Sequence, residues 1–342
     1  NDAREDVAIR LYGITKWANE HAIDIIIHLH INDNPRNGIK AIINQAKKLE
    51  LTITDVVFTI APRINAAGRM KHGNYAVELL TEMDLDSAIE FAAAIEIFNA
   101  DRKDLDKKIT DQALIQIIDN KEEQKYSSVV YQEDWHKGVI GIVASRLIEK
   151  YYRPTLVFTK SGDKLAASAR SVKGFDVYNA LHECEEFIEQ FGGHKYAAGL
   201  TLLPENYENF KKKFEEVVEK TIDKKLLTPE ISVDAEIELF EITPKFFRII
   251  QQMAPFGPMN MKPTFKSTCV RDNGYGKQVG ADKTHLKLNV FQGDNKRTFN
   301  SIGFGLGDKM KLVKNDFDIV YALDENEWNG NKNIQLLLKD LR

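Results

Sequence analysis

The hydrophobic pattern of this chain changes its period close to Lys225. Upstream, continuous apolar runs such as Ile23–Ile27 and Thr155–Phe158 alternate with longer segments whose apolar residues recur every three or four positions. Downstream, as in residues 285–290, apolar residues alternate one by one with polar residues. The first pattern is typical of helices and buried strands, and the second of half-buried strands. The sequence therefore predicts an α/β part followed by a small all-β domain.

A long helical segment divides the α/β part. Residues 73–120 carry almost no strand signal, and apolar residues continue in helical spacing from Ala88 to Ile117. Such an element between α/β units is typical of a strut between domains. We therefore expect two α/β domains across a cleft, joined by a long helix.

The expected elements follow from the same patterns. Before the strut we expect a helix over 14–21, strands over 23–27 and 56–60, and a helix that begins near Asn37. After it we expect strands over 129–131, 155–158, 164–171 and 199–203, and helices over 138–152, 176–190 and 205–220. Beyond Lys225, five or six short strands, beginning with the alternating run 231–239, fit an OB-type β-barrel.

Composition excludes several classes of protein. The chain has 342 residues, enough for two or three domains, and it contains no apolar run long enough for a membrane helix. Its first residues do not form a signal peptide, and Cys184 and Cys269 stand alone without metal-ligand spacing. We therefore expect a cytoplasmic protein with reduced cysteines and no membrane partner. The formal net charge of −4 argues mildly against nucleic acid as a partner but does not exclude one, because binding depends on a local basic groove.

Four short motifs carry the candidate chemistry. In chain order they are Pro62–Met70, His136–Arg146, Ser168–Ser171 and Gly192–Gly199. In the last motif we expect a turn between a helix and a strand, where adjacent glycines let the backbone approach a ligand and His194 adds a hydrogen-bond donor. Backbone N–H groups and an imidazole suit a phosphate oxygen. A structural turn followed by a buried histidine is the alternative reading of this motif.

Arginines in the other motifs favour the same ligand. Arg63 and Arg69 flank a predicted turn of small residues, and Arg170 stands between two serines at a strand end. A guanidinium group matches phosphate oxygens bidentately, whereas the ordinary alternative for each arginine is a surface ion pair. His136 precedes a predicted helix start, where it either draws an anion or packs beside Trp135.

Taken together and in this order, the motifs resemble those of RecJ, a family of single-strand-specific DNA exonucleases in the DHH phosphoesterase superfamily. The resemblance runs from about Ile14 to Arg342. It implies 5′-to-3′ hydrolysis of single-stranded DNA with Mn²⁺ or Mg²⁺, in DNA repair and recombination. It further implies a single-strand-binding protein and a helicase as partners.

The resemblance also implies site residues and domains. The implied phosphate and DNA contacts are Arg63, Asn65, Arg69, His136, Ser168, Arg170, Ser171, Gly192, Gly193 and His194. We expect Arg63, Arg170, Ser171 and His194 to converge on one cleft. The implied domains are a partial DHH-type domain (1–78), a helical connector (79–124), a DHH-associated α/β domain (125–226) and an OB-fold nucleic-acid-binding domain (227–342).

The metal ligands of the superfamily do not stand where the resemblance would place them. An Asp-His-His triplet is expected after the strand Ile23–Ile27, but His28-Leu29-His30 follows it. Hydrolysis by two hard cations needs clustered carboxylates. We therefore predict joins between fragments of a longer chain near Gly13/Ile14 and Ile27/His28, with the catalytic and metal-binding residues unassigned. The alternative is a degenerate protein.

Two other functions stay open. The first is a phosphodiesterase of the same superfamily that acts on short oligonucleotides or cyclic dinucleotides, which would have no need of a strand-binding barrel. The second is a non-catalytic single-stranded DNA-binding protein, which the missing aspartates would favour.

Overall fold

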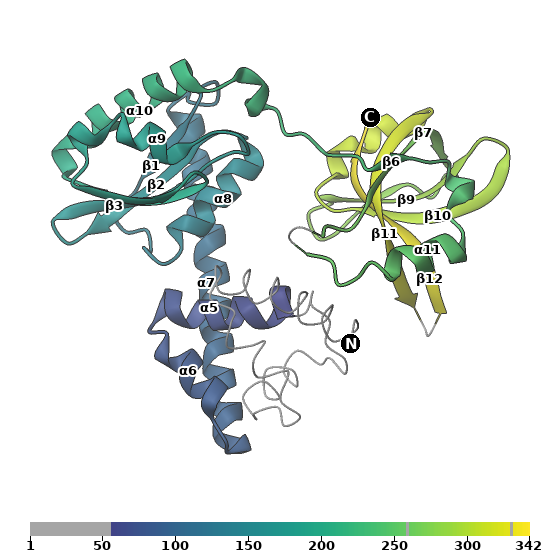
Figure 1. Cartoon of the computed structure of the whole chain (residues 1–342), viewed down its shortest axis with the longest axis horizontal. Coiled ribbons are helices and arrows are strands. Elements are labelled where there is room, and N and C mark those ends of the chain that lie inside the picture. Colours follow the sequence, from purple (N-terminus) through teal and green to yellow (C-terminus); the bar gives the residue numbers. More distant parts are fainter. Residues whose placement is uncertain (1–55, 258–259, 329–330) are drawn as a thin grey trace, which may run out of the picture. The chain divides into compact units, whose positions relative to one another are not determined.

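The computed structural model describes residues 56–257, 260–328 and 331–342. The chain divides into two compact units, residues 1–229 and 230–342, and each is described by itself (Figure 1). The helix expected over 14–21, the strand over 23–27, the helix near Asn37 and the two predicted joins all lie outside the described residues. No helix among the described residues is both long and apolar enough to cross a membrane.

The first described segment of unit 1 is helical, which corrects two expectations. Val56–Ile60, expected as a strand, forms a π-helical turn (η1) that leads into α5, Ala61–Met70. The predicted turn Asn65–Gly68 lies inside α5. The proline sits in the first turn of α5, where its missing N–H costs nothing, and Ala66 and Ala67 bury a small apolar face. Packing of this face overrides the strand preference of the β-branched residues before it.

The strut is a single continuous helix. After the short helix α6 (Asn74–Thr81), α7 runs over 35 residues from Leu85 to Asp119, a length of about 50 Å. The Asp84 carboxylate caps it by accepting a hydrogen bond from the Ser87 N–H at 2.8 Å, and no glycine or proline interrupts it. Its first half packs on α5 and α6 and its second half on α8 and β1 (Figure 1).

A five-stranded sheet follows α7, in the order β1-β2-β3-β5-β4. Its strands are β1 (Ser128–Tyr131), β2 (Thr155–Ser161), β3 (Lys164–Arg170), β4 (Gln190–His194) and β5 (Ala197–Leu202). Only β1 and β2 pair in parallel. Helix α8 (Ile140–Lys150) packs on one face, while α9 (Val177–His182) and α10 (Tyr207–Thr221) pack on the other.

Alternate residues of β2 pack against different helices and so distinguish the two faces of the sheet. Leu156 and Phe158 belong to the core shared with Phe210 of α10, whereas Val157 packs against the α8 residues. The structure confirms the strands and helices expected over 129–220, with one exception. The helix expected over 176–190 ends at His182, and a 3₁₀ turn, Glu185–Phe187, leads into β4. The Gly192–Gly193 pair consequently lies within an edge strand and not in a turn between a helix and a strand.

Unit 2 is a closed barrel of the OB type. The barrel strands are β7 (Thr264–Asp272), β9 (His285–Gln292), β10 (Asn295–Gly303), β11 (Phe317–Trp328) and β12 (Asn331–Leu341). They pair in the order β7-β11-β12-β10-β9, and a β7–β9 pairing closes the ring. The expected run 231–239 contributes only the two residues of β6, Ala235–Glu236, and the three-residue strand β8, Lys277–Val279, pairs with β9. Helix α11 (Pro244–Gln251) and the 3₁₀ helix Gly307–Lys314 contribute to the same core.

Candidate functional site

Strand register brings the third and fourth motifs together on one face of the sheet. Arg170 of β3 pairs with Ala197 of β5, and Ala197 pairs with His194 of β4. Directly paired residues of antiparallel strands share a face, so the arginine and the histidine stand on the same side, two strands or about 10 Å apart. The small alanine side chain between them leaves the space above it open.

A second row of paired residues extends this surface. Ser168 of β3 pairs with Gly199, which pairs with Gly192. A Cβ atom at Gly192 would meet nothing within 4 Å, and one at Gly199 would make only an ordinary contact, at 3.7 Å from a backbone oxygen. We call Gly192, Ala197 and Gly199 the shelf: a part of the sheet face that is nearly bare of side chains.

Gly193 has a different role from its neighbour. Its φ of +149° is one that L side chains rarely adopt, and a Cβ atom would lie 2.3 Å from the Ala197 carbonyl oxygen. The first glycine of the pair therefore leaves the surface open, and the second allows the hairpin itself to form.

Arg170 is held at the border between the shelf and helix α8. Its guanidinium donates to the Ser168 hydroxyl at 2.9 Å and to the Ala169 carbonyl at 2.8 Å. Gly141, in the first turn of α8, lies so close that a Cβ atom there would be 2.9 Å from both the guanidinium and the Ser168 hydroxyl. The absence of a side chain at Gly141 lets the start of α8 lie directly on this pair.

Helix α5 reaches the same region through its last turn. Arg69 donates to the Gly138 carbonyl at 3.1 Å, and a Cβ atom on Gly138 would lie 2.2 Å from the Arg69 carbonyl oxygen. The ring nitrogen Nδ1 of His136 accepts from the Gly138 N–H at 3.1 Å. The first and second motifs thus meet at a glycine, beside the arginine of the third motif.

A further arginine joins from α7, and no sequence motif marks it. Arg102 donates to the Asn99 side-chain oxygen at 2.9 Å and lies 3.5 Å from the Asp106 carboxylate. Arg146 of α8 approaches the same carboxylate at 3.7 Å, so that Asp106 connects the two helices. One oxygen of Asp106 and the amide nitrogen of Asn99 are buried without a hydrogen-bond partner in the structure.

The electrostatics of this cluster favour an anion. Desolvation lowers the pKa of the Arg170 guanidinium, and the charge of Arg69 lowers it further. Desolvation by surrounding protein also lowers the pKa of Arg69, although the residue keeps exposed surface, and the charge of Arg102 adds to this effect. Two partly desolvated cations that repel each other are stabilised by a bound anion. A phosphate group has the charge and the acceptors that this cluster lacks.

Three predicted site residues direct their side chains to other partners or form no side-chain bond to this cluster among the described residues, although the Ser171 N–H donates to the Tyr196 carbonyl in the β4–β5 turn at 3.0 Å. Arg63 pairs with Glu96 of α7 at 2.5 Å and donates to the Thr59 carbonyl. The Ser171 hydroxyl donates to the Phe175 carbonyl at 3.0 Å and closes a turn. Asn65 is half-buried on α5. Arg170 and His194 therefore share a surface as expected, whereas Arg63 and Ser171 have structural partners.

The described residues do not supply a metal site. They contain no group of three or more His, Cys, Asp or Glu side chains placed to hold an ion. The groups beside the shelf are guanidinium, imidazole and hydroxyl groups, which suit an anion and not a hard cation, and the nearby Asp106 carboxylate already pairs with Arg102 and Arg146.

Comparison with known proteins agrees with the fold. Residues 105–220 match the family described as the DHHA1 domain, and residues 233–340 match the RecJ OB domain. The chain belongs to the RecJ family. RecJ of Bacillus subtilis, a "single-stranded-DNA-specific exonuclease", is 33% identical over 83% of this chain and 36% of its own length. RecJ of Salmonella typhimurium is 30% identical over 90% of this chain and 54% of its own length.

Solved RecJ structures have the same fold. The crystal structure of Thermus thermophilus RecJ in complex with Mn²⁺ matches 94% of this chain and 46% of its own chain, with a TM-score of 0.77 and 25% identity. The same protein in complex with Mg²⁺ matches with a TM-score of 0.75. The chain thus spans about half, or less, of the length of these RecJ relatives.

Sequence reasoning missed Gly141, Arg102 and Asp106. Gly141 stands inside the second motif, but only the packing of α8 on β3 shows that its missing Cβ matters. Arg102 and Asp106 are polar residues in a helix rich in charge, and their spacing of four residues is the one signal that predicts an ion pair.

Proposed function

We propose that this chain is part of a metal-dependent, 5′-to-3′ single-stranded DNA exonuclease of the cytoplasm, active in DNA repair and recombination. The observation that supports this most directly is the row Arg170–Ala197–His194, which places a cation and an imidazole at two sides of the bare shelf. A flexible single strand can lie on the flat, open shelf, whereas a duplex with its stacked bases is wider.

In this proposal Arg170 and the Ser168 hydroxyl bind the terminal phosphate, with Arg69 beside them. His194 donates to the next phosphate, and the sugar–phosphate backbone lies over Gly192 and Gly199 between them. These groups position the strand and neutralise its charge, a task in which guanidinium groups act through preorganised geometry. His136 orients the Gly138 loop through its hydrogen bond.

The divalent metal, Mn²⁺ or Mg²⁺, would supply the activated water and stabilise the departing oxygen. Residues 56–257, 260–328 and 331–342 do not fit such an ion, so we assign it no ligand here. For the domains we keep the division into 1–78, 79–124, 125–226 and 227–342. A single-strand-binding protein and a helicase remain part of the proposal as partners.

The test compares oligonucleotides that differ only at their 5′ end. A single strand with a 5′-phosphate and one with a 5′-hydroxyl are incubated with the whole protein and Mn²⁺, and mononucleotide release is measured. Arg170→Gln should lower kcat/KM for the phosphorylated strand at least tenfold and reduce the preference for the phosphate. Arg248→Gln, an exposed arginine on α11, serves as the matched control.

Two other outcomes identify the remaining functions, and a third contradicts the phosphate contact. Release from dinucleotides but not from long strands would indicate a small-substrate phosphodiesterase. Tight strand binding with no release in either metal would indicate a non-catalytic binding protein. Equal activity of Arg170→Gln and wild type would contradict the proposed phosphate contact.

A further inference from the structure

The hairpin turn between β4 and β5 carries an exposed aromatic ring at the end of the shelf. The turn consists of Lys195 and Tyr196, because His194 and Ala197 are the last paired residues of the two strands. Tyr196 remains 47% exposed. Its ring centre lies 6.5 Å from the centre of the His194 ring, with the two ring planes at 72°. The tyrosine ring therefore lies beside the imidazole that borders the shelf, and it adds a flat apolar surface to a row of polar groups.

Hydrogen bonds hold both residues of this turn against the segment that follows β3. The Ser171 N–H donates to the Tyr196 carbonyl at 3.0 Å, and the Val177 N–H donates to the Lys195 carbonyl at 3.1 Å. The Lys195 ammonium lies 5.7 Å from the centre of the Tyr196 ring, a cation–π contact within the turn. A ring on an anchored backbone loses little entropy when another ring stacks on it.

The backbone of Tyr196 also fixes the donor atom of His194. The Tyr196 N–H donates to Nδ1 of the imidazole at 3.3 Å. A neutral imidazole whose Nδ1 accepts a hydrogen bond carries its proton on Nε2, so Nε2 is the atom that donates to a phosphate. Replacement of the Tyr196 side chain leaves this backbone bond in place. The aromatic ring and the histidine donor can therefore be tested separately.

The order of groups on the shelf places the first base of a bound strand next to Tyr196. Arg170, Ala197 and His194 form the row of paired residues nearest to the turn. In the proposed function the phosphates at Arg170 and His194 flank the first nucleotide, and the sugar–phosphate backbone lies over the two glycines of the shelf. A base that extends from this backbone past Ala197 reaches the turn, where the tyrosine ring lies.

We propose that Tyr196 is a specificity-determining residue that stacks on the base of the 5′-terminal nucleotide. The inference rests on the proposed function for its ligand class, and it adds a contact with a base to a site whose arginines and histidine bind phosphates. Stacking needs only a π-face, so each of the four bases satisfies this contact. A strand whose first residue lacks a base does not satisfy it.

The first experiment compares two fluorescent single strands that carry the same phosphates. Both have 12 nucleotides and a 5′-phosphate, and one of them has an abasic residue at position 1. Binding to the whole protein is measured in the presence of a chelator, so that no hydrolysis occurs. Wild type should prefer the complete strand about 5- to 100-fold, the range for one stacked base. Tyr196→Ala should abolish this preference, whereas Tyr196→Phe should retain it.

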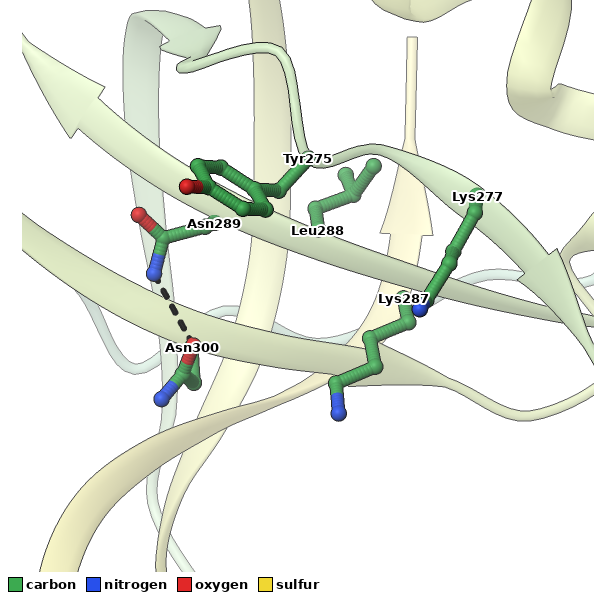
Figure 2. A pocket seen from close by; sticks show the side chains of 6 residues that line it. All are labelled: Tyr275, Lys277, Lys287, Leu288, Asn289 and Asn300. Atoms are coloured by element: carbon green, nitrogen blue, oxygen red, sulfur yellow. Dashed lines mark hydrogen bonds between the residues drawn. The ribbon is translucent and has the colours of Figure 1, made fainter.

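Three control variants separate stacking from a general loss of affinity. Tyr178→Ala removes a tyrosine that is 38% exposed and packs on Phe191 at the opposite face of the sheet, and it should keep the full preference. His194→Gln removes a phosphate contact and should weaken binding of both strands by the same factor. Tyr275→Ala changes a ring in a hollow of about 400 Å³ on the barrel (Figure 2) and should leave the preference at position 1 unchanged. Unfolding temperatures verify that all variants are folded.

The second experiment measures hydrolysis of the complete strand with Mn²⁺. The base is remote from the reacting phosphate, so stacking contributes equally to the ground state and the transition state. Tyr196→Ala should therefore raise KM by a factor similar to its loss of affinity and leave kcat within about twofold of wild type. With the abasic strand, Tyr196→Ala and wild type should have the same KM.

A base preference in Tyr196→Ala equal to that of wild type would overturn the inference, and so would equal binding of the two strands by wild type. If wild type releases no nucleotides with Mn²⁺ but loses its base preference on Tyr196→Ala substitution, the exonuclease proposal fails and the inference stands. If wild type cleaves and Tyr196→Ala keeps the preference, the inference fails and the exonuclease proposal stands.

Discussion

Two adjacent glycines show how register decides the role of a residue. Neither Gly192 nor Gly193 carries a Cβ atom. A Cβ atom added at Gly192 would face open space, whereas one added at Gly193 would meet the backbone of Ala197. Sequence reasoning identifies the pair and its companion His194, because adjacent glycines in a polar segment indicate close approach. It cannot tell the two glycines apart, because their difference arises from φ and from the strand that pairs with them.

Substitution at this pair separates binding from stability. Gly192→Val should leave the free energy of unfolding within about 0.5 kcal/mol of wild type, since a Cβ atom at this position meets no atom within 4 Å, but it should place two methyl groups on the shelf and reduce strand binding at least tenfold. Gly193→Ala should cost about 1–3 kcal/mol of stability because of its φ and the close carbonyl. Chemical denaturation and oligonucleotide titration measure the two effects. Equal behaviour of the two variants would contradict this assignment.

Gly141 supports a second prediction at the same scale. A methyl group there would press on Arg170 and Ser168, so Gly141→Ala should shift the guanidinium and lower affinity for the 5′-phosphorylated strand more than for the 5′-hydroxyl strand. Ser145→Ala, at an exposed position one turn further along α8, is the control. A uniform loss on both strands would indicate a general packing defect instead.

At the scale of elements, α7 organises unit 1. Its buried face carries small and apolar residues, from Ala88 to Ile117, but also the polar Asn99 and Asp106. The carboxylate joins Arg102 on the same helix to Arg146 on α8. A buried charge is stabilised only by its partners, so this carboxylate ties the arginines to a fixed place.

Removal of that charge has a predictable cost. Asp106→Asn should destabilise unit 1 by about 1–3 kcal/mol, since Arg102 would lose its counter-charge while Arg146 is half-exposed and regains water. Glu149→Gln, which removes the exposed partner of Arg146, should change stability by less than about 0.5 kcal/mol. Thermal unfolding of the two variants compares them directly. An equal effect would mean that Asp106 gains nothing from burial.

At the scale of the whole molecule, the two units have separate cores. The buried residues around Phe158 and Phe210 and those around Tyr321 and Leu336 share no member. Residues 228–236 between them are exposed throughout. Among the lysines and arginines that the structure describes, trypsin should therefore cut first at Lys224 and Lys225 and separate the two units. A first cut inside either sheet would contradict this division.

Loss of the barrel should affect strand binding in a specific way. Without the residues after Leu226, affinity for a single strand should fall, and the remaining binding should depend less on salt, because fewer counterions are released. Titrations at several salt concentrations measure both quantities. Unchanged affinity and slope would show that the barrel has another purpose.

The sequence predicts most of this architecture, and its failures have physical causes. The periods of residues 85–119 and 285–290 determine the connector and the barrel strands, because burial on one face demands them. Val56–Ile60 is misread because packing overrides β-propensity, and β4 is misread because its glycines hide the strand pattern. For the site, motif order leads to Arg170 and His194, whereas Arg102 and Asp106 require the contact between helices to be known.

Because α7 is continuous, the number of residues between two of its contact points sets the rotation and the distance between the elements that they hold. Glu96 holds Arg63 of α5, while the side chains of Gln112 and Gln116 bond Trp135 and Tyr131 on the sheet side. One residue inserted between these points would turn one end relative to the other by about 100° and advance it by about 1.5 Å. Arg69 would then lose its hydrogen bond to the Gly138 carbonyl, and the arginine cluster would come apart although none of its own residues had been changed. An insertion or deletion in the middle of α7 should therefore disrupt anion binding, just as substitution of the arginines themselves should.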